Sequence, residues 1–264
     1  MSFAVLAIGA HPDDIEFLMA GTLLRLKEAG AELHMWNLCN GCYGSAVLAD
    51  KEEVARIRGE EAKSAAAIAG AAIYPPIADD VALFYEWPHI LRVAAVVRAV
   101  KPRIILTLSP QDYMEDHQNA GRLAVTGAFV HGIKPIETDP PTDPWPGECT
   151  LYHALPYALR DNLRQAVRAG QYVDIAPVLA TKREMLARHR SQKEWLDVSQ
   201  GMDSYLTNME EQSRAVGRQS GRFAYAEGWR RHLHVGFSAE DSDPLAEMLG
   251  DACWVDAEYE QGLG

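Results

Sequence analysis

Two histidines and an aspartate, each placed after an apolar run, are the residues best suited to metal chemistry in this sequence. His11 and Asp14 follow residues 3–10, and His117 follows residues 104–110 after a short polar stretch. If both runs form adjacent parallel strands, their carboxyl ends bring the three side chains together at the edge where open α/β sheets bind ligands. Two imidazoles and one carboxylate suit a catalytic zinc that keeps one position open for water.

The alternative for the second segment is a purely structural role. Asp116 is a plausible N-cap of the helix that follows, and His117 would then lie in the cap without binding a ligand. The first segment, HPDD at residues 11–14, fits a structural role less well. Unpaired carboxylates are costly away from water, whereas paired or metal-bound ones are not.

Alternating strand and helix patterns surround the two segments. Strands are expected over residues 4–10, 33–38, near 73, 103–108, 151–153 and 172–175, and helices over 16–28, 51–69, 88–100, 119–130, 177–190 and 202–218. The βαβα order of the first half predicts a parallel sheet with helices on both faces. The turn after the first strand lacks the G-x-G-x-x-G phosphate cradle, so no dinucleotide cofactor is expected.

Composition indicates a single α/β domain over residues 1–264, with a core of about 1–175 and a C-terminal helical extension of about 176–264. The formal net charge of -12 argues against nucleic acid or an anionic membrane as the partner. The sequence has no membrane-spanning run and no basic leader, so we expect a cytoplasmic location.

Two further segments leave alternatives open. Residues 135–147 are rich in proline and cannot form a regular helix, so they are expected to be a lid, an oligomer contact or a simple connector. Cys39 and Cys42 are expected to be free thiols, because a structural zinc would need a second close pair. The acidic tail from residue 240 onward is expected to be a solvated face.

Three sequence blocks resemble the zinc-dependent deacetylases of the LmbE-like family, also called the PIG-L family. The blocks are AHPDD at 10–14, DYMEDH at 112–117, and residues 58–70, which fit the pattern R-x-x-E-x-x-x-A-x-x-x-x-G. Residues 189–192 and 223–228 are similar to the less specific C-terminal half of the family. The resemblance implies a Rossmann-like three-layer sandwich with a mostly parallel central sheet and an added C-terminal helical segment.

The resemblance also implies roles for individual residues. His11, Asp14 and His117 would ligate Zn²⁺ or another divalent ion, and Asp13 would act as general base on the bound water. Asp116 would lie behind the ligands and orient an imidazole.

One position departs from the family pattern. The common form of the second block is D-Y-H-P-D-H, and this chain has Met114 in place of its first histidine. In the family that histidine is thought to stabilise the oxyanion or help the leaving amine, and a thioether cannot donate a hydrogen bond. Tyr113, His153 and Arg58 are candidate replacements. We expect His153 to take the catalytic role, because an imidazole can both donate to the oxyanion and pass a proton to the amine; the alternative is a half-buried strand residue.

The function that the resemblance implies is a zinc-dependent N-deacetylase. Such an enzyme would hydrolyse the linear amide C–N bond of an N-acetylated amino-sugar conjugate of the N-acetylglucosamine type, with Arg58, Asn40 and Tyr113 at the substrate. The expected partner is that small molecule, with homo-oligomer formation left open. The alternatives are an amidase on another N-acylated small molecule, such as a thiol conjugate, and a non-catalytic metal- or sugar-binding pseudoenzyme. Asp13 argues against the pseudoenzyme, because a pure binder needs no extra carboxylate at the metal.

Overall fold

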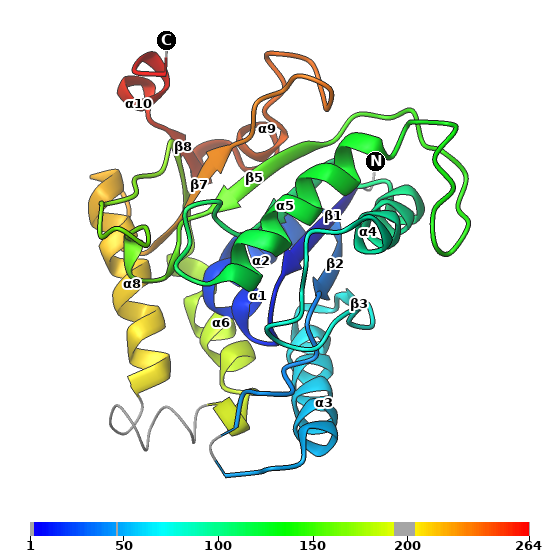
Figure 1. The fold of residues 1–264 in the computed structure, drawn as a ribbon. Helices are drawn as coiled ribbons and strands as arrows, with labels where there is room; N and C mark the ends of the chain where they lie inside the picture. Colours follow the sequence, from blue (N-terminus) through cyan, green and yellow to red (C-terminus); the bar gives the residue numbers. More distant parts are fainter. Residues whose placement is uncertain (1–2, 46, 193–203, 264) are drawn as a thin grey trace.

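A single sheet forms the centre of the computed structural model, which describes residues 3–45, 47–192 and 204–263. Within these residues it has eight strands in the order β3-β2-β1-β4-β5-β7-β6-β8 (Figure 1). The strands are β1 (Phe3–Gly9), β2 (Ala31–Asn37), β3 (Ala72–Ile73), β4 (Ile104–Thr107), β5 (Thr150–Ala154), β6 (Gln171–Asp174), β7 (Ala226–Arg231) and β8 (Cys253–Val255). The pairs from β3 to β5 are parallel, and the last three pairs are antiparallel. The predicted α/β class with a mostly parallel sheet is confirmed.

The helices that connect the parallel strands cover both faces of the sheet (Figure 1). α1 (Asp14–Leu18) and α2 (Ala20–Glu28) join β1 to β2, and α3 (Lys51–Ala69) joins β2 to β3. α4 (Trp87–Val100) leads to β4, and α5 (Glu115–Val130) follows it. Such crossovers are right-handed, and the direction of strand addition reverses at β1. The first three helices therefore lie on one face, while α4 and α5 pack together on the other.

The segment expected to be a helical extension is more mixed than predicted. It contains α6 (Leu179–Leu186), α8 (Ser204–Ser220), α9 (Pro244–Leu249), α10 (Ala257–Gln261) and the short 3-10 helices η2 (Ala176–Val178) and η3 (Gly250–Ala252), while η1 (Tyr157–Leu159) precedes it. It also supplies the strands β7 and β8, which enlarge the sheet beside β5 and β6. The charged sequence of β7 hides its strand character, because its polar side chains have specific partners. The acidic tail is not only a solvated face, since Leu245 is fully buried.

Two helix boundaries differ from the sequence prediction in ways that affect the site. The helix expected over 16–28 is divided at Met19, where φ is -131°, into α1 and α2. The helix expected from 119 begins at Glu115, so Met114 and not Asp116 is its N-cap residue. For the helix expected over 202–218, residues 202–203 lie outside the described residues, and α8 continues to Ser220.

α3 begins and ends where its sequence predicts. The Asp50 side chain accepts a hydrogen bond from the Glu52 backbone N–H at 3.0 Å, which satisfies one of the free donors of the first turn. Gly70 ends the helix in the left-handed region, with φ of 64°, where a residue without Cβ is favoured. The helix buries Arg58 on its inner face.

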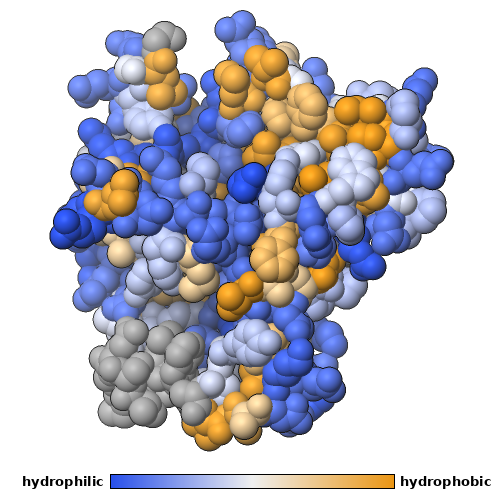
Figure 2. All heavy atoms as spheres, in the orientation of Figure 1, coloured by the Kyte–Doolittle hydropathy of each residue, from blue (hydrophilic) through white to orange (hydrophobic). Residues whose placement is uncertain are grey.

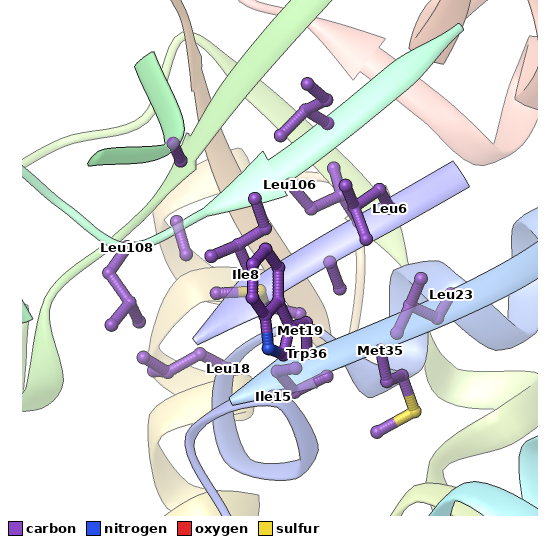
Figure 3. Packing of buried hydrophobic residues seen from close by; sticks show 14 of the residues in the cluster. Leu6, Ile8, Ile15, Leu18, Met19, Leu23, Met35, Trp36, Leu106 and Leu108 are labelled. Carbon is purple, nitrogen blue, oxygen red and sulfur yellow. The ribbon is translucent and has the colours of Figure 1, made fainter. Parts of the chain in front are cut away.

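The main core lies between the parallel strands and the helices on either side. Its residues are apolar and mostly inaccessible to solvent. Figure 3 labels Leu6 and Ile8 of β1, Met35 and Trp36 of β2, Leu106 of β4, Leu108 just beyond it, and Ile15, Leu18, Met19 and Leu23 from α1, α2 and the residue between them. Burial of β1 on both faces explains its continuous apolar sequence.

On the face shown in Figure 2, hydrophobic residues occur in separate groups among hydrophilic ones. Among the described residues, no helix combines the length and the apolar character needed to cross a membrane. The cytoplasmic location stays a prediction.

The proline-rich segment 135–147 is held by one buried arginine. Arg98 donates from Nη1 to the Ile136 and Thr142 carbonyls of this segment, at 3.1 and 2.8 Å. Its Nε and Nη2 donate to the His131 and Ile133 carbonyls just before the segment, at 2.8 and 3.0 Å. Neither of the two large cavities described below is lined by residues of this segment. The structure therefore does not support a role for this segment as a lid. Its roles as a simple connector or an oligomer contact stay predictions.

A buried carboxylate joins the C-terminal strands to the first half of the chain. Glu227 of β7 accepts hydrogen bonds from the backbone N–H groups of Gly21 and Thr22, at 2.8 and 2.7 Å. It also forms an ion pair with Lys182 at 2.5 Å. Trp229 donates from Nε1 to Thr22 Oγ1 at 2.9 Å. Both charged groups are almost completely buried, so removal of one leaves the other buried without a counter-charge.

Lys182→Met is therefore expected to lower the free energy of unfolding by about 3 to 5 kcal/mol. The matched control is Arg183→Met on the same helix, because the pair of Arg183 with Glu210 is solvent-exposed and should contribute less than about 1 kcal/mol. Urea unfolding of both variants measures the difference. Equal losses would contradict a special role for the buried pair.

Candidate metal and catalytic site

The candidate site lies where the strand order of the sheet reverses. β1 and β4 are parallel neighbours, with Ile8 opposite Thr107, and Thr107 Oγ1 donates to the Ile8 carbonyl at 3.1 Å. The connections leave these two strands in opposite directions, which opens a crevice at their carboxyl ends. His11 lies in the turn after β1, and His117 lies in the first turn of α5, which follows β4. The pairing thus brings together residues 106 positions apart.

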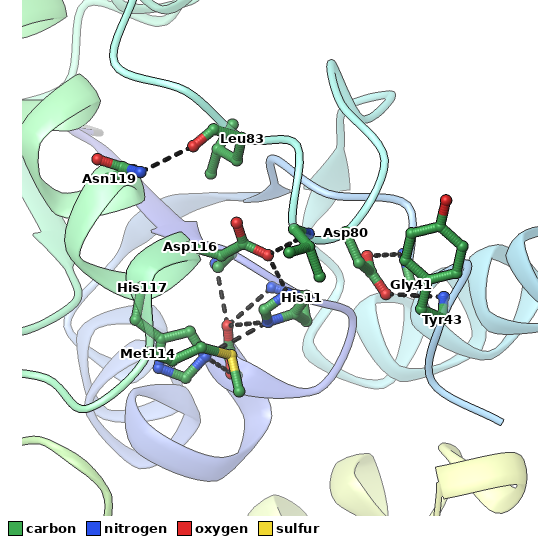
Figure 4. A network of polar contacts seen from close by, with 12 residues as sticks. His11, Gly41, Tyr43, Asp80, Leu83, Met114, Asp116, His117 and Asn119 are labelled. Atoms are coloured by element: carbon green, nitrogen blue, oxygen red, sulfur yellow. Dashed lines mark hydrogen bonds and ion pairs between the residues drawn. The ribbon is translucent and has the colours of Figure 1, made fainter. Parts of the chain in front are cut away.

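His11, Asp14 and His117 converge as the sequence predicts. His11 Nδ1 lies 3.3 Å from His117 Nε2, and His117 Nε2 lies 3.3 Å from Asp14 Oδ1. His11 Nδ1 lies 3.7 Å from Asp14 Oδ2. One potential ligand atom from each residue falls within 4.8 Å of the other two. Figure 4 shows the two imidazoles side by side.

The Asp14 carboxylate is held in its ionised form. The backbone N–H groups of Ala10 and His11 donate to Asp14 Oδ2, at 3.0 and 2.8 Å. Burial opposes ionisation, but the charge and hydrogen bond of His117 and the contacts with His11 together lower the pKa of Asp14 below its usual range. An ionised carboxylate is the form that binds a cation.

The outer nitrogens of both imidazoles face carboxylates. His11 Nε2 donates to Asp116 Oδ2 at 2.9 Å, and His117 Nδ1 lies 3.1 Å from Asp112 Oδ1. Asp116 Oδ2 also accepts the Val81 backbone N–H at 2.7 Å (Figure 4). Carboxylates in this position select the tautomer whose inner nitrogen carries a lone pair, as in metal-ligating histidines generally. Asp116 lies where the resemblance implies, and Asp112 is a second such residue that the sequence analysis did not assign.

The donor set fits a divalent cation, because two imidazole nitrogens and one ionised carboxylate converge while carboxylates hold the outer nitrogens. A second group, His11 with Cys39 and Asp80, is also close enough to hold an ion. Its members are less suitable. Burial and nearby carboxylates raise the pKa of Cys39, which disfavours the thiolate, and Asp80 accepts the backbone N–H groups of Gly41 and Tyr43.

Asp13 lies beside this group with its carboxylate turned to different partners. It is the N-cap residue of α1 and has φ of 113°, which is strained for a residue with a Cβ. Its Oδ2 accepts a hydrogen bond from Tyr205 Oη at 2.6 Å and lies 3.4 Å from Arg58 Nη2. Burial raises the pKa of Asp13 above its ordinary value, although Arg58 acts in the opposite direction.

A cavity of about 630 Å³ contains the whole group. Of the three residues expected at the substrate, Arg58 and Tyr113 line it. Arg58 donates from Nη2 to the Pro12 carbonyl at 2.5 Å, and Tyr113 is 55% exposed. Asn40 is not among the lining residues, because its side chain donates to Asp79 Oδ1 at 2.6 Å.

His153 does not join the group. It lies within β5 and not beyond its end, so its side chain takes the direction set by the strand. Its Nδ1 donates to the Leu108 carbonyl at 2.9 Å, and its Nε2 lies 3.1 Å from His232 Nδ1. Both ring nitrogens are engaged, and the residue lines a different cavity. The geometry gives the expected catalytic role of His153 no support.

Several lining residues were missed by the sequence analysis. They include Phe17, Asp80, Tyr157, Gln192, Tyr205 and Asn208. Asp80 carried only a weak signal, because it lies in the segment after the third strand but well beyond the strand end. Tyr205 carried none, since it contacts Asp13 across 192 positions of sequence.

Comparison with known proteins agrees with this geometry. Residues 6–128, which include all the residues of the converging group, match the family PIG-L, described as GlcNAc-PI de-N-acetylase. The diacetylchitobiose deacetylase of Thermococcus kodakarensis is 28% identical over 240 residues, covering 86% of this chain and 82% of that protein. The chain is homologous to the LmbE-like deacetylases.

Solved structures share the LmbE-like fold. The N,N'-diacetylchitobiose deacetylase from Pyrococcus horikoshii superposes with a TM-score of 0.75 at 20% identity, over 92% of this chain and 88% of that chain. GalB, the 4-carboxy-2-hydroxymuconate hydratase of Pseudomonas putida KT2440, superposes with a TM-score of 0.71 at 23% identity, over 87% and 95%. Since one of these relatives is a hydratase, the fold alone does not specify the reaction.

His117→Ala is expected to abolish binding of one divalent cation per chain, because the variant leaves only one imidazole and one carboxylate. His153→Ala is the matched control and should keep the cation, since His153 lines the other cavity. Elemental analysis of both purified variants measures the stoichiometry. Full occupancy in His117→Ala would remove this residue from the ligand set.

Proposed function

We propose that this chain is a metal-dependent N-deacetylase that hydrolyses the acetamide of an N-acetylglucosamine-type amino-sugar conjugate. One observation carries the proposal: the Asp13 carboxylate lies beside the His11, Asp14 and His117 group and lines the same cavity. The reaction class is supported by the PIG-L match, described as GlcNAc-PI de-N-acetylase, and by the relative named diacetylchitobiose deacetylase, because both names refer to N-acetylated sugars. The cavity volume is ordinary for a small-molecule site.

We propose zinc as the cation, with His11, Asp14 and His117 as its ligands. Imidazole nitrogens suit zinc and other late transition ions, whereas magnesium and calcium prefer oxygen ligands. When bound, such a cation polarises a carbonyl and lowers the pKa of water.

Asp13 is proposed as the general base. It accepts a proton from the attacking water as the new bond from oxygen to the acetyl carbon forms, and it passes that proton to the nitrogen as the C–N bond breaks. The products are acetate and the free amine. Burial raises the pKa of Asp13 toward the working range of a base near neutrality, while Arg58 and Tyr205 hold its carboxylate in place.

Tyr113 is proposed as the donor that replaces the family histidine. It lines the cavity, and its ring centroid lies 5.9 Å from that of His117. Burial and the nearby charge of Asp112 raise the pKa of Tyr113 to about 12, so its hydroxyl keeps the proton that it would donate to an oxyanion. Arg58 is less suitable, because its guanidinium is already engaged by Pro12 and Asp13.

The direct test is acetate release from N-acetylglucosamine, N,N'-diacetylchitobiose and an N-acetylated cysteine conjugate, each with and without a chelator. Release from an amino sugar that stops with chelator and returns with added zinc is the expected result. Release only from the cysteine conjugate would indicate the amidase. No release from a metal-loaded chain would leave the pseudoenzyme.

Asp13→Asn is expected to keep the cation and to lower turnover by about two to four powers of ten, because the amide cannot accept the proton. Asp251→Asn, at an exposed position away from the cavity, is the control and should have normal turnover. Steady-state kinetics with elemental analysis separates the two effects. Near-normal turnover in Asp13→Asn would exclude this residue as the base.

Tyr113→Phe is expected to lower kcat by about a hundredfold to a thousandfold, the usual effect of losing an oxyanion donor. Tyr43→Phe, another exposed tyrosine of the cavity, should change kcat little. If Tyr113 already donates, Met114→His gives unchanged or lower activity in the native background and restores activity in Tyr113→Phe. A rise in kcat for Met114→His alone would show that no donor is in place.

A further inference from the structure

A second cavity, of about 410 Å³, lies along α5 on the side of β5 and β7. Its lining residues share none with the metal-site cavity: they are Tyr85, Pro110, Gly121, Arg122, Val125, Thr126, His153, Arg230, Arg231, His232 and Leu233. The first turn of α5 carries His117, and the following turns line this cavity. The proposed deacetylase reaction uses none of these residues.

The charge of this cavity is opposite to that of the chain. Three arginines and two histidines line it, and no aspartate or glutamate does, although the chain has a formal net charge of -12. Among the described residues, Arg122 and Arg230 form no ion pair with a carboxylate, and Arg231 Nη2 lies 3.9 Å from Glu260 Oε2. No carboxylate therefore neutralises the positive charges of Arg122 and Arg230, and both charges can attract an anion.

The arginines are held by neighbours that leave donors available. The Arg122 guanidinium lies over the Tyr85 ring, 4.1 Å from its centroid. The Tyr85 hydroxyl and Thr126 Oγ1 form a hydrogen bond of 2.9 Å. Stacking on a ring leaves the N–H groups at the guanidinium edge for a ligand. Arg230 donates from Nε to the Tyr259 hydroxyl at 2.9 Å and from Nη1 to Gln111 Oε1, which fixes its side chain and leaves Nη2 without a hydrogen bond among the described residues.

The two histidines form an ordered wall of the same cavity. The Leu108 carbonyl can only accept, so His153 donates to it from Nδ1 and accepts from His232 Nδ1 through Nε2. Burial lowers the pKa of His153 to about 4, so this arrangement persists near neutral pH. Pro110, Val125 and Leu233 add apolar surface, which suits the carbon skeleton of an organic ligand better than inorganic phosphate.

We propose that this cavity is a second binding site, which takes a small organic carboxylate through Arg122 and Arg230 independently of the metal site. Guanidinium groups bind carboxylates with paired, charge-assisted hydrogen bonds. The apolar wall contacts the rest of the ligand. The ligand is therefore an organic anion with an apolar carbon skeleton. A reaction product and a regulatory effector of this chemistry fit the site equally.

Benzoate and benzamide are a suitable probe pair, because they differ in charge and hardly in shape. Calorimetry on the metal-loaded chain should show benzoate binding at least about tenfold more tightly than benzamide and than inorganic phosphate. Arg122→Leu should weaken benzoate binding by about tenfold or more, and Arg122→Lys by less. Arg218→Leu, an exposed arginine on α8, is the matched control and should bind benzoate normally.

His11→Ala separates this site from the metal group and should leave benzoate binding unchanged. Loss of binding in that variant would place the carboxylate on the metal and overturn the proposal. Equal binding of benzoate and benzamide, tighter binding of phosphate, or normal binding by folded Arg122→Leu would also overturn it. Thermal melting checks that each variant is folded, and Arg230→Gln gives the same test if Arg122→Leu does not fold.

Discussion

The parallel pairing of β1 with β4 is the constraint on which the site depends. The two strands belong to separate βα units, and their register places Ile8 opposite Thr107. A shift of that register would carry the turn after β1 away from the first turn of α5 and separate the two imidazoles. The buried core beside these strands therefore maintains the geometry of His11 and His117, although it contributes no chemistry.

Around that constraint, each polar group of the site is held by a different part of the chain. Asp14 is held by backbone N–H groups of its own turn, whereas Asp116 is joined to the segment after β3 through Val81. Asp13 depends on Arg58 from α3 and on Tyr205 from α8. The C-terminal half is thus part of the site as well as an addition to the sheet. Hydrogen bonds from the Gly21 and Thr22 backbone N–H groups to Glu227 fix that half to α2, and Lys182 supplies the counter-charge.

The sequence predicts residues whose position follows from strand ends, and it fails where tertiary contacts decide. His11, Asp14 and His117 could be placed because each follows an apolar run that ends at the same edge of the sheet. The catalytic role expected for His153 gains no support, because this residue lies inside β5, where hydrogen bonds to Leu108 and His232 set the direction of its side chain. No spacing rule connects Tyr205 to Asp13. The sequence does not predict the strand β7, because Glu227 and its charged neighbours hide the alternation of apolar and polar residues that marks a strand.

Anomalous X-ray diffraction above and below the zinc absorption edge, from crystals of the chain purified without chelator, shows directly whether His11, Asp14 and His117 hold zinc. One anomalous peak is expected, at about 2.0 to 2.2 Å from His11 Nδ1, His117 Nε2 and an oxygen of Asp14. A peak bound instead by Cys39 and Asp80, or a metal-loaded chain whose two imidazoles contact only protein atoms, would contradict it.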